Sequence, residues 1–231
     1  REMVCILISQ KNYMNRITKL LVLICFLPAT GFSQSFRISY EPGYGLYSMS
    51  DLKSQQQIMI KNYPIPIMSV EEFPGYFNHS VSVDYFLDSN ILFGINASYL
   101  TTGGRNFSGD YSGEYKLDMI LNAYQYGIES EYNFFLNNSI RLFLNFKLGI
   151  ISSTLNIDES LILYDINSQH NNHTLTQSNF FMEPNAGLSF NITKRLLARA
   201  TIGFNIDTSA MSGKLIDWTG FRTRIGTCYQ F

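Results

Sequence analysis

The chain has 231 residues, of which 45% are hydrophobic and 15% are charged, and its formal net charge is −1. This length suits one large β domain, and the charge lacks the basic excess of a nucleic-acid-binding surface. The longest apolar run, residues 17–29, is shorter than the ~20 residues that a membrane-spanning helix needs. The sequence therefore predicts neither a nucleic-acid partner nor a transmembrane helix.

The first part of the chain has the features of a targeting segment. A basic region and an apolar core occupy residues 16–27, and small residues precede Gln34 at the spacing of a signal-peptidase site. We predict that translation starts at Met14 and that residues 1–33 are an upstream extension plus a signal peptide. The predicted mature domain spans residues 34–231.

From residue 35 onward, apolar and polar residues alternate in eight segments, as in strands with one apolar and one polar face. In the fourth segment the apolar residues change from odd to even positions, and we predict a bulge near Asn122 and Ala123. The predicted strands span residues 35–47, 76–87, 91–101, 114–134, 140–150, 178–192, 196–206 and 218–231.

The connections between these strands alternate in length. Three short turns cover residues 88–90, 136–139 and 193–195, whereas long loops are predicted at 48–75, 102–113, 152–177 and 207–217. The first long loop has helical spacing from Met49 to Ile60, followed by three prolines that argue against regular structure. We favour a surface loop with one short helix over a functional lid there. The loop at 152–177 is rich in Asn, Ser and His, and we predict that it is mobile.

The last segment, Trp218 to Phe231, has a largely apolar face opposite a small or charged face and ends in an aromatic residue. With its even strand number and loop asymmetry, the chain resembles the small eight-stranded outer-membrane barrels of the OmpX and OmpA-transmembrane-domain type. Tyr229 and Phe231 carry the resemblance as the assembly-signal positions. It implies an all-β, eight-stranded, antiparallel, up-and-down transmembrane barrel with short periplasmic turns and long extracellular loops.

This resemblance also implies where the protein is and what it contacts. We expect it in the bacterial outer membrane, with both termini in the periplasm and with lipid and lipopolysaccharide around the barrel. The barrel-assembly machinery is the expected partner during insertion, and other envelope proteins are candidate partners afterwards.

Charged residues share the parity that faces the interior of the predicted barrel. An eight-stranded barrel is only wide enough inside for side chains, so we favour a structural ion-pair network over a water-filled channel. The predicted lumen residues are Arg37, Glu41, Asp84, Glu129, Glu131, Arg141, Lys147, Glu183, Arg199, Arg222 and Arg224.

The chain offers little chemistry. His170 and His173 have a metal-ligand spacing but lack the further ligands of a site, so we favour a solvated loop. His79 is predicted to face lipid, and Val81 takes the place of the serine that some outer-membrane lipid hydrolases carry beside such a histidine. Neither a phosphate-binding loop nor a nucleophile elbow occurs. We predict no catalytic residue, metal site or cofactor.

These features predict a non-enzymatic integral outer-membrane protein. It would act through its extracellular loops or as an accessory subunit of a larger envelope complex. Two alternatives remain open at this point, a small pore and a lipid-A-modifying enzyme.

Overall fold

The structure is a computed structural model that describes residues 36–47, 49–61, 68–111, 113–135, 139–163, 166–209 and 215–231. Phe36–Gln230 form one compact unit, which contains every element described below. The predicted signal peptide and its cleavage site lie outside the described residues. Within the described part of the chain, no helix has the length and apolar character needed to cross a membrane.

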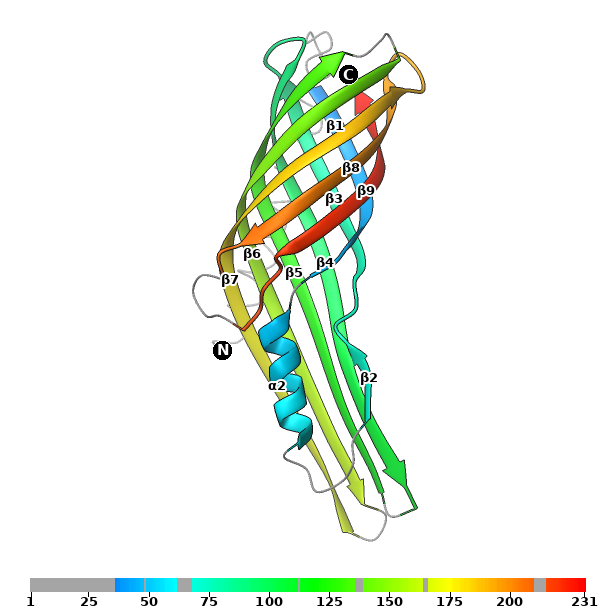
Figure 1. Cartoon of the computed structure of the whole chain (residues 1–231), viewed down its shortest axis with the longest axis vertical. Helices are drawn as coiled ribbons and strands as arrows, with labels where there is room; N and C mark the ends of the chain where they lie inside the picture. Colours follow the sequence, from blue (N-terminus) through cyan, green and yellow to red (C-terminus); the bar gives the residue numbers. More distant parts are fainter. Residues whose placement is uncertain are drawn as a thin grey trace, which may run out of the picture. The chain divides into compact units, whose positions relative to one another are not determined.

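Eight strands close into an antiparallel ring (Figure 1). Since β1 pairs with both β3 and β9, and β4 with both β3 and β5, the ring leaves no open edge. The predicted eight-stranded antiparallel barrel is confirmed. The strands are β1 (Phe36–Gly45), β3 (Tyr76–Phe86), β4 (Ile91–Asp110), β5 (Gly113–Phe135), β6 (Ile140–Leu163), β7 (Ile166–Asn191), β8 (Leu196–Asp207) and β9 (Gly220–Gln230).

Three short connections lie at one end of the ring, which we call the short-turn end. They join β3 to β4, β5 to β6, and β7 to β8, as the sequence predicted. The turn after β3 is closed by the amide of Leu87, which donates to the carbonyl of Ile91 at 2.9 Å. The turn after β7 is closed in the same way, from Ile192 to Leu196.

Strand β3 shows why these sequences form a barrel wall. Val81 and Val83 are exposed on the outer face, whereas Ser80, Ser82 and Asp84 are buried on the inner face. Branched apolar side chains suit a strand whose outer face is surrounded by lipid, and polar side chains can then pair inside the ring.

The predicted loops at 102–113 and 152–177 are wrong. Strand β4 continues to Asp110, and β6 and β7 pair without interruption from Ile140↔Phe190 to Leu161↔Gln169. The strands carry polar residues on an exposed face in this part of the molecule, and their composition therefore resembles that of a loop.

Strands β4 to β7 therefore extend beyond the ring as a four-stranded sheet (Figure 1). We call this the projecting sheet, and we use "ring" for the remaining parts of the eight strands. The projecting sheet consists of residues 102–110 of β4, 113–121 of β5, 152–163 of β6 and 166–178 of β7.

Two elements of the first long connection lie along the projecting sheet (Figure 1). The helix α2 (Ser50–Lys61) confirms the predicted short helix. The strand β2 (Met68–Glu72) was not predicted, because prolines flank it on both sides. It pairs with β4 between Gly104 and Phe107, on the edge that β3 stops covering at Leu100. An exposed edge that would otherwise attract other strands is thereby occupied.

The predicted bulge near Asn122 and Ala123 is also wrong. The register of β5 with both neighbours is unbroken, and its odd-numbered residues face inward along its whole length. In the ring these inward residues are polar, as at Gln125 and Glu129, but in the projecting sheet they are apolar, as at Leu117. What changes near residue 123 is the polarity of the two faces, since the buried face is polar in the ring and apolar in the projecting sheet.

Candidate functional site

The interior of the ring nearest the short-turn end is filled by a chain of ion pairs, which we call the lower cluster. Arg37 lies 2.8 Å from Asp84 and 2.5 Å from Glu131. Arg199 lies 2.8 Å from Glu131 and 2.8 Å from Glu41. All five side chains are buried, so β1, β3, β5 and β8 are joined across the lumen.

Two further charged residues, Lys147 and Glu129, complete the lower cluster. The ammonium of Lys147 lies 3.4 Å from a carboxylate oxygen of Glu129 and donates to the hydroxyl of Ser80 at 3.4 Å. The guanidinium of Arg199 lies 3.9 Å from the centre of the Phe143 ring. Such stacking stabilises a cation that is removed from water.

An upper cluster lies farther from the short-turn end. One carboxylate, Glu183, pairs with Arg222 at 2.8 Å and with Arg224 at 2.6 Å. Arg222 also donates to the side-chain oxygen of Gln125 at 2.7 Å. These charged groups are fully buried, and removing one member of such a group leaves its partner uncompensated.

The two clusters contain every predicted lumen residue except Arg141, which lies half-buried at the short-turn end of β6. Parity alone placed these residues inside the barrel, but it could not show how they divide. Their pairing leaves five buried acids against five buried bases in the two clusters, so the charges there balance.

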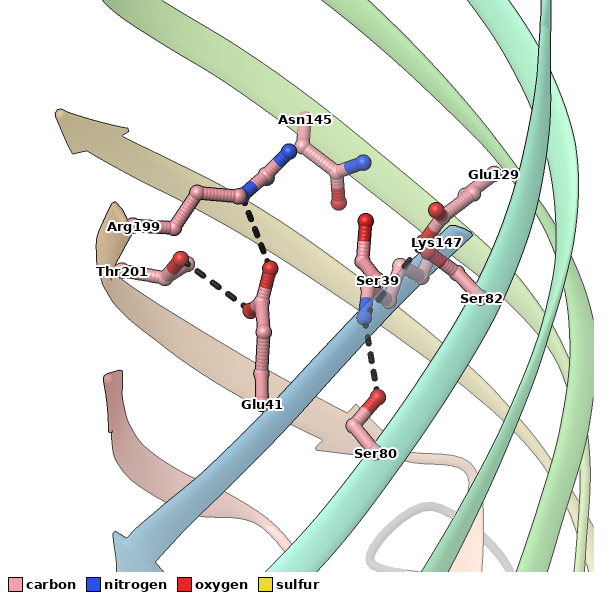
Figure 2. Close-up of a pocket in the computed structure, with 9 residues that line it drawn as sticks. All are labelled: Ser39, Glu41, Ser80, Ser82, Glu129, Asn145, Lys147, Arg199 and Thr201. Carbon is pink, nitrogen blue, oxygen red and sulfur yellow. Dashed lines mark hydrogen bonds and ion pairs between the residues drawn. The ribbon is translucent and has the colours of Figure 1, made fainter. Parts of the chain in front are cut away.

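A small cavity remains within the lower cluster (Figure 2). Figure 2 shows Arg199 and Thr201 pointing toward Glu41, and Lys147 pointing toward Ser80. The cavity has a volume of about 10 Å³, which is room for about one water molecule. This part of the lumen is therefore occupied by side chains and does not form an open path.

Aromatic residues cover the upper cluster. Trp218 is completely buried, and its ring nitrogen donates to the hydroxyl of Ser153 at 2.8 Å. The Tyr47 ring packs edge-on against it, with 4.7 Å between ring centres. The side chain of Asn205 donates to the Trp218 carbonyl at 2.9 Å, which ties this cover to β8.

An apolar core continues beyond these aromatic residues into the projecting sheet. Side chains from the inward face of β5 and β6 pack against α2 and against the segment that leads into β9. Each large apolar side chain buried in this way contributes about 1.5–3 kcal/mol. The core includes Met49, Leu52, Phe73, Tyr115, Leu117, Met119, Leu121, Ile151, Leu155, Ile216 and Trp218.

On β6 and β7 the opposite face of the projecting sheet is largely polar, whereas Phe107 of β4 and Ile120 of β5 are exposed on it. Pairs of small residues face each other across β6 and β7, among them Ser152↔Ser178, Thr154↔Thr176 and Asn156↔Thr174. The Thr174 hydroxyl donates to the side-chain oxygen of Asn156 at 3.0 Å. This face therefore offers hydroxyl and amide groups on a sheet that its own core holds in place.

A charged group lies on the same face of β4 and β5. Asp118 pairs with Arg105 at 2.6 Å and with Lys116 at 2.8 Å. Partial burial alone would raise the pKa of Asp118, but hydrogen bonds from Arg105 and Lys116 outweigh it and lower this pKa below its ordinary value. Asp158 of β6 pairs with Asp118 in the register, so two carboxylates match the two cations at this position.

The histidines are spread over two parts of the molecule. His170 lies 3.4 Å from Asp158 on the projecting sheet. In the part of the chain that the structure describes, no group of three or more His, Cys, Asp or Glu side chains is placed to hold a metal ion. His79 faces outward on β3, and its Nδ1 lies 2.9 Å from the Tyr40 hydroxyl, whereas the neighbouring Ser80 is buried inside.

The sequence matches no protein-family model and no curated protein. Solved structures similar to it include three outer-membrane proteins. Ail of Yersinia pestis is 14% identical, with 85% of this chain and 99% of Ail covered and a TM-score of 0.42. Neisserial surface protein A is 12% identical, with 87% of this chain and 99% of that protein covered and a TM-score of 0.43. The N-terminal β-barrel domain of Pseudomonas aeruginosa OprF is 14% identical, with 86% of this chain and 98% of that domain covered and a TM-score of 0.40. This likeness is one of fold.

Three features of the site were missed from the sequence. These are the aromatic cover made by Trp218 and Tyr47, the strand β2, and the projecting sheet itself. The exchange of apolar residues from odd to even positions along the fourth predicted strand was the available signal. Because the strand has no bulge, the exchange means that the same inward face is apolar in the projecting sheet and polar in the ring.

Proposed function

We propose that the protein is a non-enzymatic integral component of the bacterial outer membrane that presents the projecting sheet outside the cell as a contact surface. The observation that carries the proposal is the filled interior. Paired charges occupy the ring, and an apolar core closes it toward the projecting sheet. The surface left for a partner is then on the sheet.

The membrane location is supported by the polarity of the ring. A closed antiparallel barrel satisfies its backbone hydrogen bonds internally, which a structure surrounded by lipid requires. Its outer face carries exposed apolar residues such as Ile95, Ile128 and Leu148, while charged residues are buried inside. The short turns would face the periplasm, together with the start of β1 and the end of β9, which pair at Arg37↔Gln230.

The form of the projecting sheet supports a contact role. Small hydroxyl and amide side chains lose little conformational entropy when a partner covers them, and the core beneath the sheet holds them in place before binding. Such a surface suits another envelope protein, and an accessory subunit of a membrane complex would use it in this way.

The small pore is the main rival, and conductance tests it. In planar bilayers the purified protein should be electrically silent, because paired side chains fill the described part of the lumen and the cavity among them has a volume of only about 10 Å³. Discrete and stable single-channel steps from the folded protein would show that the interior opens and would reject the proposal.

The contact role can be tested by photo-cross-linking in native membranes. A photoreactive residue at Thr176 lies on the polar face of the projecting sheet, and the matched control at Gln57 lies on α2, which packs against the other face. We expect a discrete protein adduct from Thr176 and none from Gln57. Equal labelling at the two sites, or no adduct from any residue of the polar face, would contradict the proposal.

A further inference from the structure

The connection between β1 and β3 places α2 and β2 along the projecting sheet (Figure 1). We call these two elements the cover. The side of α2 that packs against the sheet carries Leu52, Gln56 and Met59, at the spacing i, i+4 and i+7. Of these three, Leu52 is a fully buried apolar side chain, but the central one is a glutamine and Met59 is only partly buried. Little apolar packing therefore holds α2 in place.

The strand beneath α2 is also polar. Thr102, Gly104 and Asn106 share the buried face of β4. A Cβ atom at Gly104 would lie 2.9 Å from the side-chain nitrogen of Gln56, so this amide lies directly against the strand. The Thr102 hydroxyl and both ends of the Asn106 amide are buried without a hydrogen-bond partner among the described residues. Water would satisfy these groups if the interface opened, so their burial favours opening.

The backbone is strained at both ends of the cover. Met49 and Phe73 have φ angles of 45° and 46°, in the left-handed region, although neither is a glycine. Both side chains are buried in the core, which holds the backbone in this conformation. The strand β2 is only five residues long, and its register with β4 shifts between Ser69 and Glu71. Strain at the two ends and a short, irregular ladder lower the cost of detaching the cover.

We propose that the cover is a hinged lid. In the open state, α2 and β2 lift from the projecting sheet about Met49 and Phe73, and Thr102 and Asn106 bond to water. The sheet stays together, because β4 pairs with β5, β5 with β6 and β6 with β7 independently of the cover. Its apolar face can thus be shielded or bared without unfolding of the barrel. This inference goes beyond the proposed contact role, which uses the opposite face of the sheet and needs no movement of α2.

The test is thiol labelling of the folded full barrel in detergent with a water-soluble maleimide. In a background with all three cysteines replaced by serine, Thr102→Cys places a thiol under the cover. The matched control, Ser153→Cys, places one against Trp218. Both changes replace a buried hydroxyl by a thiol. Slower gel migration after heating shows that each variant was folded.

We expect Thr102→Cys to react at least about tenfold faster than Ser153→Cys, because only the first thiol is bared when the cover lifts. Equal rates at the two sites, or no reaction at either, would overturn the lid. The region would then open only as a whole, or not at all.

A second change separates a lid from an ordinary loose segment. Asn106→Leu, added to Thr102→Cys, removes the unpaired amide and should slow labelling about tenfold, the scale of one buried unpaired polar group. Leu52→Ala, added in the same way, should speed labelling at least about tenfold. Asn106→Val replaces Asn106→Leu if the latter does not fold. Labelling that is unchanged or faster after the change at Asn106 would show that the buried polar groups do not favour opening, and would overturn the proposal.

Discussion

Strands β4 to β7 pass through two environments, and the ring and the projecting sheet can be compared residue by residue within them. In the ring, β5 buries Gln125, Glu129 and Glu131 and exposes apolar side chains. In the projecting sheet, the same inward face buries Leu117 and Met119. The backbone register of β5 is continuous throughout, so the difference between the two regions does not come from a break or bulge in the strand.

The two regions are also stabilised differently. In the ring, closure satisfies the backbone and buried ions pair with one another, whereas the projecting sheet relies on an apolar core under α2. The sheet, unlike the ring, has edges. β2 covers the edge of β4, and the side chain of Gln177 on β7 donates to the Ile216 carbonyl at 2.8 Å. The hydrophobic effect therefore stabilises the sheet through the apolar core under it. In the ring, the apolar side chains lie on the outer face, where they contact lipid.

The largest effect is expected from breaking the upper cluster of the ring. Glu183→Gln leaves Arg222 and Arg224 without their shared carboxylate and should lower the free energy of unfolding by ~3 to 5 kcal/mol. Trp218 is the one tryptophan of the chain, so its fluorescence reports urea unfolding. The control, Glu114→Gln on the projecting sheet, should change stability by less than about 0.5 kcal/mol. Equal effects of the two changes would mean that the buried pairs do not stabilise the ring.

A core change should affect the projecting sheet and leave the ring closed. Leu117→Ala removes a fully buried side chain and should cost about 2–5 kcal/mol. Amide hydrogen exchange should show faster exchange in residues 113–121 and 152–163, with β8 and β9 as protected as in wild type. Loss of protection throughout the ring would show that the two regions unfold as one unit.

A charge placed on the outer face should destabilise the ring more than the projecting sheet. Ile128→Arg lies on the lipid-facing belt and should cost about 2–4 kcal/mol. Ile120→Arg is the same change on the same strand and face, eight residues away, and should cost less than about 0.5 kcal/mol because water surrounds that position. Urea unfolding of both variants provides the measurement, and similar losses for the two would contradict the difference in surroundings.

The smallest effect is expected at the partly exposed group around Asp118. Because the pKa of Asp118 is lowered in the folded state, its contribution is present above the ordinary pKa of an aspartate and is lost as the pH falls through the lowered value. Asp118→Asn should cost less than about 1 kcal/mol at pH 7 and nothing in strong acid. Hydrogen exchange in β4 and β5 at the two pH values tests this, and a loss that is independent of pH would reject it.

The ring could be predicted from the sequence because lipid on one side and paired charges on the other give a strong alternation. Ser80 and Val81 differ in polarity for that reason. Parity also put Glu183 on the same face as Arg222 and Arg224, which the structure places within 2.8 Å of it. Their assignment to one cluster, however, depends on the register of strands that are distant in sequence.

The projecting sheet could not be predicted in the same way. Residues 152–177 have water on one face, and Ser, Thr and Asn on that face resemble the composition of a loop. Residues such as Leu155 belong to a core that also includes residues of α2 and of the segment at Ile216, which lie far away in the sequence. Strand β2 was missed for a related reason, since only its pairing with β4 identifies it.

Site-directed spin labelling can directly measure the proposed change of surroundings along β5. In a background with all three cysteines replaced by serine, single labels at outward positions of β5 are compared for collision with oxygen, which concentrates in lipid, and with a water-soluble nickel complex. We predict oxygen-dominated collisions at Tyr132, Ile128 and Tyr126, and nickel-dominated collisions at Ile120 and Lys116. Oxygen-dominated collisions as far as Lys116, or nickel-dominated collisions at Ile128, would contradict the division into a lipid-embedded ring and a water-exposed sheet.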